Sequence, residues 1–359
     1  MENELELLST NAKCETCGSN IVFDPKSQNL KCPQCSNEYQ FEKSREQVKH
    51  LINEVNEDKN SHDSWAAEMK VVKCQTCGAK ITISGLSMTS CCPYCGSDYV
   101  VEEKQLVGLK PDVVLPFAFD EEDASIRFAK GIKKKFFAPR ALKKRLPKNK
   151  IHGIYVPAFT FDADTSSSYK GVLKKVTSRT DSKGRTHTDV KYINISGTQD
   201  MVHRDYVVET SSKITEKEIN SLLPFNLNES YKYTNNFIRG YAVEHYEDSL
   251  EKCYKDAQKG MEARIKKTIL SKYDYTSVES FNCYTTYFNA LFSYRLMPIY
   301  CFEFLWKDKK YITYMNGQSG KIGIGYPKSK LKQFMVGFVI FIVLVAIAIL
   351  FIWLGMDSE

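Results

Sequence analysis

The longest apolar run of the chain, Phe334 to Met356, lies at its end and contains no charged residue. A helix over Phe334–Gly355 would extend about 33 Å at about 1.5 Å per residue, and the hydrocarbon core of a membrane is about 30 Å thick. The pattern therefore predicts one transmembrane helix over residues 334–356.

Charge on the two sides of this run predicts its orientation. Lys328, Lys330 and Lys332 lie in a basic segment, 328–333, before the run, whereas Asp357-Ser358-Glu359 follow it. Basic residues mark the cytoplasmic side of a membrane span. We therefore expect a tail-anchored, single-pass protein of the cell membrane with a cytoplasmic N-terminal part, which also keeps the thiols in a reducing compartment.

The apolar positions between residues 105 and 327 change their period several times. Ser249 to Leu270 has apolar residues on one helical face, and Thr215 to Glu218 has the form of a capping box that opens a short helix. Runs rich in β-branched and aromatic residues predict strands at 113–117, 153–165, 168–178, 188–196, 280–289, 296–306 and 310–315. Since helices and strands do not alternate regularly, we expect an α+β domain with a mainly antiparallel sheet rather than a parallel βαβ fold.

A further helix is predicted over Ser44 to Val55, where Val48, Leu51, Ile52 and Val55 follow helical spacing. Its apolar stripe is narrow, so we expect it to be a connector that packs on a neighbouring cysteine-rich segment.

The cysteines form an internal repeat. Residues 13–39 and 73–99 each carry two cysteine pairs, with two residues inside each pair and fourteen between the pairs. The eight cysteines in this register are Cys14, Cys17, Cys32, Cys35, Cys74, Cys77, Cys92 and Cys95.

This spacing is typical of a four-cysteine zinc ribbon. Two residues between cysteines let a tight turn aim both thiolates at one ion, and the fourteen-residue interval suffices for a hairpin that returns the second pair. Cys91 is an extra thiol, but the register assigns Cys92 as the ligand. Disulfides or redox pairs are the alternatives, and two matched copies favour two structural Zn²⁺ ions over both.

The predicted organisation has six parts. They are a first zinc ribbon at 1–41, a linker with a short helix at 42–70, a second ribbon at 71–104, the α+β domain at 105–327, the basic segment at 328–333 and the transmembrane helix at 334–356.

Basic residues outnumber acidic residues by 50 to 43, and the excess is concentrated in one stretch. Ala124 to Lys150 contains eleven Lys or Arg and no acid. One interpretation is a solvated helix face that keeps the domain soluble. In another, Lys133, Lys134 and Lys135 join Lys328, Lys330 and Lys332 in binding an anionic membrane surface. The stretch could also contact nucleic-acid phosphates.

Catalytic patterns are missing from the sequence. It contains no GxxxxGK[ST] phosphate loop and no His-Glu-x-x-His motif. Asp162 and Asp164 share one face of a strand and could bind a metal or act as a carboxylate pair, but without a nearby histidine a solvated strand face is the better interpretation. His187 and His203 are likewise typical of surface strands. We therefore predict no catalytic residue, no small-molecule substrate and no enzyme activity.

Two motifs resemble a known family. Gly153-Ile154-Tyr155-Val156-Pro157, followed by Phe161-Asp162-Ala163-Asp164, is similar to one of its segments, and Leu296-Met297-Pro298 with the turn Asn316-Gly317-Gln318-Ser319-Gly320-Lys321 is similar to another. With the ribbons, they resemble the TFIIB-type zinc-ribbon proteins of Gram-positive bacteria, which are sometimes labelled primosomal helicase or phage replication proteins. The second ribbon, the terminal span, Ala158-Phe159 and Tyr300 depart from that pattern.

The resemblance implies a membrane-associated scaffold or adaptor, with a role in envelope stress. We accordingly expect a membrane-tethered zinc-ribbon adaptor for cytosolic protein partners. The alternative is a membrane-associated nucleic-acid-binding protein of replication or transcription. Charge favours the adaptor over the nucleic-acid-binding protein. Residues 13–39 carry three basic and three acidic side chains, and a four-thiolate zinc site adds about −2, so the ribbon would repel phosphates.

Overall fold

The computed structural model describes residues 13–54, 69–84, 92–94, 97, 104–105, 109–144, 149–181 and 184–356. The chain divides into two compact units. The first comprises Met1–Phe161, Asp205–Ala257 and Leu291–Pro327, and the second comprises Asp162–Arg204, Gln258–Ala290 and Lys328–Glu359.

The first unit contains most of the elements. Its strands are β1 (Val22–Asp24), β2 (Asn29–Lys31), β3 (Glu38–Tyr39), β4 (His50–Leu51), β5 (Met69–Lys73), β6 (Lys80–Ser84), β7 (Lys104–Gln105), β8 (Val113–Val114), β11 (Tyr231–Lys232), β12 (Ala242–Glu244) and β14 (Lys309–Asn316). Its helices are α3 (Glu121–Lys134), α4 (Arg140–Lys144), α5 (Glu216–Leu222), α6 (Asn235–Ile238) and the 3-10 turns η1 (Ile52–Glu54) and η3 (Leu227–Glu229). Four elements continue into the second unit, namely β9 (Asn149–Thr180), β10 (Thr186–Glu209), α7 (Leu250–Leu270) and β13 (Ser277–Trp306), and α8 (Lys330–Met356) belongs to the second unit.

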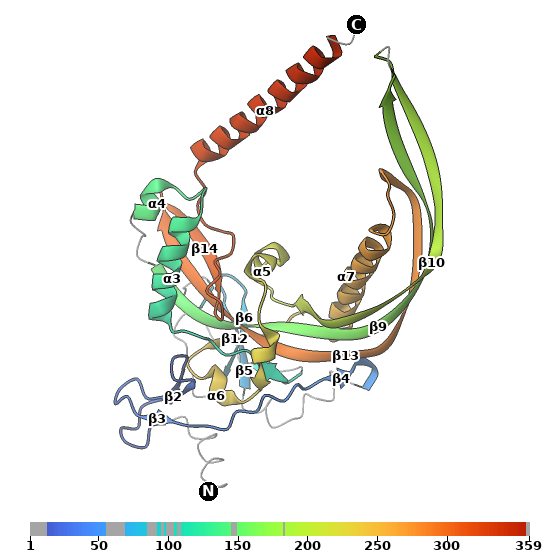
Figure 1. Cartoon of the computed structure of the whole chain (residues 1–359). Helices are drawn as coiled ribbons and strands as arrows, with labels where there is room; N and C mark the ends of the chain where they lie inside the picture. Colours follow the sequence, from blue (N-terminus) through green and yellow to red (C-terminus); the bar gives the residue numbers. More distant parts are fainter. Residues whose placement is uncertain are drawn as a thin grey trace. The chain divides into compact units, whose positions relative to one another are not determined.

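Two sheets organise the first unit (Figure 1). The small sheet has the order β1-β2-β3 and is antiparallel. The large sheet has the order β11-β8-β13-β9-β12-β6-β5-β7, with β4, β10 and β14 attached to its central strands. Most of its strand pairs are antiparallel, and the β12–β9 and β13–β8 pairs are parallel. The predicted α+β class with a mainly antiparallel sheet is therefore confirmed.

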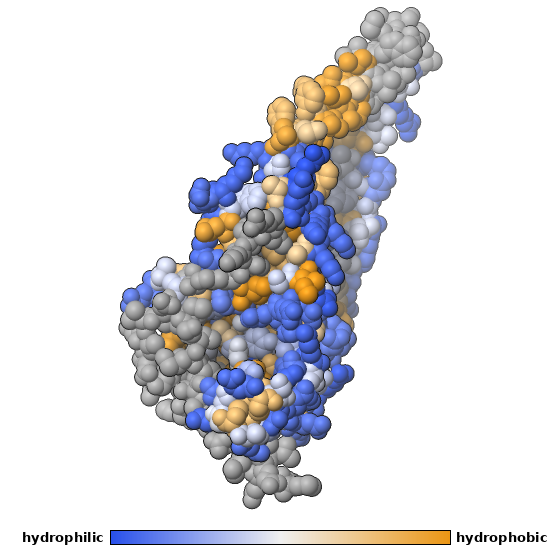
Figure 2. Space-filling model, turned by 90° about the vertical axis from the view of Figure 1, so that its left-hand side faces the viewer, coloured by the Kyte–Doolittle hydropathy of each residue, from blue (hydrophilic) through white to orange (hydrophobic). Residues whose placement is uncertain are grey.

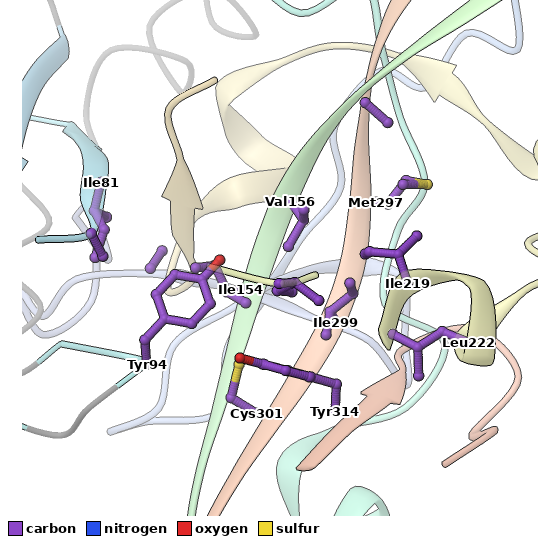
Figure 3. Packing of buried hydrophobic residues seen from close by; sticks show 14 of the residues in the cluster. Ile81, Tyr94, Ile154, Val156, Ile219, Leu222, Met297, Ile299, Cys301 and Tyr314 are labelled. Carbon is purple, nitrogen blue, oxygen red and sulfur yellow. The ribbon is translucent and has the colours of Figure 1, made fainter. Parts of the chain in front are cut away.

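The core of the first unit joins the second cysteine-rich segment to the large sheet. Ile81 and Tyr94 lie in one buried cluster with Ile154, Ile299 and Tyr314 (Figure 3). On another side, α3 buries Ala124, Phe128 and Ile132, and the Phe128 ring stacks on Phe302 with centroids 4.0 Å apart. Such stacking adds to the free energy that burial of the rings contributes.

The second unit contains parts of the strands β9, β10 and β13 and the second half of α7. Tyr169, Leu173 and Ile195 from β9 and β10 form a buried cluster with Ile265 and Ile269 from the second half of α7. The predicted helix over 249–270 is confirmed, with bounds Leu250–Leu270.

Two predictions about local structure need correction. The prediction of a helix over Ser44–Val55 was wrong. His50 and Leu51 instead form β4, which pairs with Phe292 and Leu291 of β13, and Ile52–Glu54 make one 3-10 turn. Four predicted strands are parts of two long ones, β9 with 32 residues and β13 with 30.

Helix α8 is long and apolar enough to cross a membrane over Lys330–Ile349, with a mean hydropathy of 2.5 and none of it buried. This agrees with the predicted span by length and composition.

Candidate metal centres

The four cysteines of the first ribbon converge. The Sγ atoms of Cys14, Cys17, Cys32 and Cys35 all lie within 4.8 Å of one another. Cys14 and Cys35 are 3.4 Å apart at sulfur, and Cys17 and Cys32 are 3.5 Å apart. A tetrahedral ion with metal–sulfur bonds of about 2.3 Å requires sulfur–sulfur distances of about 3.8 Å. The donor set therefore fits a four-coordinate ion such as Zn²⁺.

Both copies of the repeat build the same turn. Gly18 has φ +72° and its N–H donates to Cys14 O at 2.8 Å, while Gly78 has φ +73° and its N–H donates to Cys74 O at 2.7 Å. A positive φ favours glycine, and open space lies around the position of a Cβ on Gly18. Backbone conformation, not crowding, accounts for glycine at this position of the first turn.

The structure describes three of the four predicted ligands of the second cluster. Cys74, Cys77 and Cys92 have sulfur atoms within 4.8 Å of one another, and Cys77 and Cys92 are 3.6 Å apart. The predicted fourth ligand, Cys95, and the extra thiol Cys91 lie outside the described residues. Three converging thiols support a metal site here, and the role of Cys95 stays a prediction.

The two clusters differ in burial. In the first, Cys14 and Cys32 are buried, whereas Cys17 and Cys35 are exposed. In the second, Cys74 and Cys92 are buried likewise and belong to a core cluster of the first unit, but Cys77 is half-buried, and residues 93–94 are buried where the equivalent residues 33–34 are exposed. Strand β6 also pairs with β12 of the large sheet, and Lys213 Nζ donates to the carbonyl of Cys77 at 2.6 Å. The second ribbon is consequently part of the domain core.

The first ribbon is attached to the same body through its inner face. The Phe23 and Phe41 rings pack on Phe237 with centroids 5.5 and 5.0 Å apart. Gln28 Nε2 donates to Phe117 O at 2.8 Å, and Lys26 lies 2.7 Å from Asp120, the N-cap of α3. These contacts fix the ribbon, while residues 15–18 and 33–36 in its cysteine loops stay exposed.

A tyrosine hydroxyl contacts one sulfur atom of the first cluster. The Tyr39 hydroxyl lies 3.1 Å from Cys14 Sγ, and this hydrogen bond lowers the pKa of Cys14 to about 6, which favours the thiolate that a metal needs.

An acidic cleft of about 430 Å³ lies between the ribbon and the start of α3. It is lined by Val22, Phe23, Asp24, Pro25, Lys31, Pro33, Asp120, Glu121, Glu122, Gly240 and Tyr241. Four carboxylates against one lysine make this cleft unsuited to phosphates.

The other candidate residues are dispersed. Asp162 is 6% exposed, contrary to a solvated face, whereas Asp164 pairs with Arg204 at 2.8 Å, which lowers the pKa of Asp164. His187 is exposed beside Asp181, as expected for a surface strand. His203 is 3% exposed and burial lowers its pKa, so its expected surface position was wrong.

The predicted membrane-surface lysines also have defined environments. Lys133, Lys134, Lys328 and Lys330 are exposed, and Lys332 is half-buried. Lys135 differs, since its Nζ donates to the carbonyl of Ile322 at 2.9 Å.

Sequence reasoning missed one buried polar group. Arg295 is 1% exposed, and its guanidinium donates to Thr160 Oγ1 at 2.8 Å and to Ser230 Oγ, Gln47 Oε1 and Asp205 Oδ1, each at 3.1 Å. The alternation of apolar residues in β13 gave no sign of these partners, which come from four distant segments.

Comparison with known proteins gives one similarity. The chain is similar to the uncharacterized protein YdjG of Bacillus subtilis (strain 168), with 24% identity over 316 residues, 88% of this chain and 89% of that protein. No family model matches the chain, and no solved structure matches it. The similarity extends over nearly the whole of both chains and brings no function with it.

Proposed function

We propose that this chain is a membrane-tethered adaptor that uses its first zinc ribbon to bind cytosolic proteins. The observation that carries the proposal is the contrast between the two ribbons. Residues 93–94, between the second pair of cysteines of the second ribbon, are buried, whereas the equivalent residues 33–34 of the first ribbon are exposed. Exposed loops on a rigid scaffold are where proteins concentrate binding residues.

Zinc is the metal that we assign to both sites. Four thiolates in a reducing compartment favour Zn²⁺, and a structural site has no open coordination position for a substrate. The proposal therefore assigns the ions to folding and assigns no catalytic residue. Helix α8 supports the tether, and the basic residues Lys328, Lys330 and Lys332 before it support a cytoplasmic body.

Charge supports a protein partner over a nucleic acid at this ribbon. Asp24, Asp120, Glu121 and Glu122 line the cleft beside it, and a four-thiolate zinc site adds about −2. A nucleic acid would meet repulsion there. The resemblance to the TFIIB-type zinc-ribbon proteins supports the adaptor assignment, and we include a role in envelope stress in the proposal.

Site-specific photo-crosslinking tests the proposal in cells. A photoreactive amino acid at Gln34, an exposed residue between Cys32 and Cys35, should yield discrete adducts with cytosolic or envelope proteins. The same amino acid at Lys110, an exposed residue outside the ribbons, is the matched control. The Gln34 adducts should disappear when Cys17→Ser removes one ligand.

Three results would count against the adaptor. Adducts of equal pattern from Gln34 and Lys110 would show no specific surface at the ribbon. Crosslinks from Gln34 to DNA or RNA would favour the alternative function. A protease-sensitive tag at Met1 that is cleaved only from outside the cell would contradict the cytoplasmic orientation.

A further inference from the structure

The end of α3, the short turn after it and α4 form a basic corner. We define this α3–α4 corner as residues Lys133–Lys144. Lys135 is hydrogen-bonded to Ile322 O. The other cationic side chains of the corner are exposed or half-buried, and they are Lys133, Lys134, Arg140, Lys143 and Lys144. The corner contains no acidic residue, so the positive charge there is not neutralised within the segment.

An aromatic side chain lies among these charges. Phe136 is 63% exposed, and its ring meets Phe137 edge to face with centroids 5.2 Å apart. On the face of the molecule that carries α3 and α4, small hydrophobic patches lie among mostly hydrophilic side chains (Figure 2). Basic side chains around an exposed aromatic ring are typical of segments that lie at a membrane interface.

The inner side of the corner is fixed to the domain. Ala138 and Leu142 are 0% exposed, and the preceding helix is held by the stack of Phe128 on Phe302. The outer side chains are therefore presented by a rigid support, which limits the entropy lost when they bind a surface.

Lys135 connects the corner to the last segment of the first unit. Its Nζ donates to Ile322 O and lies 5.6 Å from the centre of the Tyr326 ring. Pro327 follows, and α8 begins at Lys330. Three residues extend at most about 10 Å. Whatever direction α8 takes, the corner is held close to the point where the chain would enter a membrane.

We propose that the α3–α4 corner binds the anionic headgroups of the membrane that α8 enters, with the Phe136 ring inserted at headgroup level. The inference rests on the proposed membrane tether and adds a second attachment. It also changes the role predicted for Lys135, which positions the corner against residues 322–326 and does not itself contact lipid. The first unit then has an attachment to the membrane in addition to its covalent link to α8.

Lipid is favoured over nucleic acid as the occupant because of this position. An exposed aromatic ring and cationic side chains could also bind a single-stranded nucleic acid. The contact of Lys135 with Ile322 and Tyr326, however, keeps the corner beside an anionic surface that the anchored chain never leaves. Each Lys or Arg at such a surface changes the ratio of bound to free corner about fivefold.

Fluorescence quenching in nanodiscs tests the inference on the full chain. Phe136→Trp is made in a background in which Trp65, Trp306 and Trp353 are each replaced by Phe, so that the new tryptophan alone fluoresces. The protein is reconstituted in nanodiscs of phosphatidylcholine with or without phosphatidylglycerol, whose acyl chains carry bromine. We expect quenching of the new tryptophan in anionic discs and little in neutral discs. Leu51→Trp is the matched control, because Leu51 is also an exposed apolar residue, at 43%, in β4 of the same unit.

Charge removal supplies the second comparison. The triple variant Lys133→Gln/Lys134→Gln/Arg140→Gln should lower the ratio of bound to free corner about a hundredfold and abolish the quenching. Lys110→Gln, which removes an exposed charge elsewhere, should leave it unchanged. Unaltered zinc content and circular dichroism show that each variant is folded.

The outcomes separate this inference from the proposed tether. A chain that does not co-purify with the discs would overturn the tether and this inference together. A chain that co-purifies but shows no quenching at Phe136→Trp would overturn only the corner. Equal quenching in neutral discs or in the triple variant would overturn headgroup binding, and loss of quenching on addition of single-stranded DNA at physiological salt would favour the nucleic acid.

Discussion

The phenolic hydroxyl of Tyr94 donates a hydrogen bond to the carboxylate of Glu244, and the two residues are 3% and 0% exposed. Tyr94 lies between the second pair of cysteines of the second ribbon, and Glu244 ends β12 in the large sheet. Glu244 also accepts from Ser212 N at 2.8 Å and Ser212 Oγ at 3.1 Å. The loop that carries the second pair of cysteines of the second ribbon is thus connected to the sheet through a buried carboxylate.

Removing the Tyr94 hydroxyl should weaken this connection. We expect Tyr94→Phe to lower the free energy of unfolding by about 1–3 kcal/mol, because it leaves a buried acceptor with one donor fewer. In a Glu244→Gln background the same change should cost less, since a neutral acceptor forms a weaker bond. Urea unfolding of the four proteins of this cycle in detergent measures the coupling, and a coupling of zero would contradict the assigned bond.

The burial of the two clusters predicts unequal effects of losing a metal ion. Protein purified without chelator should contain two Zn²⁺ per chain. Cys32→Ser should remove one and unfold only the first ribbon, since metal binding supplies much of a ribbon's folding free energy. Cys92→Ser should remove the other and destabilise the whole first unit, because Cys92 belongs to the buried cluster that joins the second ribbon to the large sheet.

Metal analysis together with thermal unfolding checks this difference. Cys91→Ser is the matched control for Cys92→Ser and should leave both zinc content and stability unchanged. Equal thermal stability of Cys32→Ser and Cys92→Ser would contradict the view that only the second ribbon belongs to the core.

The sequence was sufficient where local chemistry determines structure. The cysteine spacing predicted the ligands that converge, and Thr215 and Glu218 form the predicted capping box. The strands predicted at 296–306 and 310–315 also form, and they pair as a hairpin with positive φ at Lys307 and Asp308.

Predictions failed where distant partners determine structure. The apolar stripe of Ser44–Val55 fits a helix, but pairing of His50 and Leu51 with a strand far along the chain prevails. Separate strands were predicted at 153–165 and 168–178, but Ser167 between them is buried and hydrogen-bonded to Thr285 at 2.9 Å, and both segments belong to the single strand β9. The Tyr94–Glu244 bond joins residues 150 positions apart, a separation that no local pattern indicates.

Glu209 should make stability depend on pH. Burial, with a smaller contribution from nearby Glu244, raises the pKa of its carboxyl from 4.5 to about 7. The folded state therefore binds the proton more tightly than the unfolded state. This stabilisation is complete below about pH 4.5 and is lost as the pH rises through about 7.

Glu209→Gln keeps the side chain neutral at every pH and so separates this effect from others. At pH 8 the variant should exceed the wild type in free energy of unfolding by about 1–3 kcal/mol, and the difference should vanish near pH 4.5. Chemical unfolding at a series of pH values measures it. A difference that is constant across this range would show that Glu209 titrates normally.

Arg295 should be a strong determinant of stability. Arg295→Leu leaves Asp205 and the buried hydroxyls of Thr160 and Ser230 without the donors described above, which should cost about 3–5 kcal/mol. Arg295→Lys keeps the charge but not the planar fork, so it should recover only part of the loss. Because Arg295 also holds Gln47, limited proteolysis should cut the segment 44–54 faster in both variants, and unchanged cleavage would contradict this role.

Gly131 tests how closely α3 packs on the segment before α8. A Cβ at this position would lie 2.2 Å from Ile322 Cδ1 and 3.2 Å from its Cγ1, and Ile322 is only 5% exposed. Alanine normally stabilises a helix by about 1 kcal/mol relative to glycine. Here we expect the overlap to prevail, so that Gly131→Ala lowers the free energy of unfolding by about 1–2 kcal/mol.

Two further variants distinguish packing from helix propensity. Ile322→Val removes the Cδ1 atom, so adding it to Gly131→Ala should restore much of the lost stability. Gly337 lies in α8 with open space around the position of its Cβ, and Gly337→Ala should be neutral or stabilising. If Gly131→Ala proves as stable as wild type without the second change, α3 does not pack tightly on Ile322. The α3–α4 corner would then lose part of the support that holds it beside the chain's entry into the membrane.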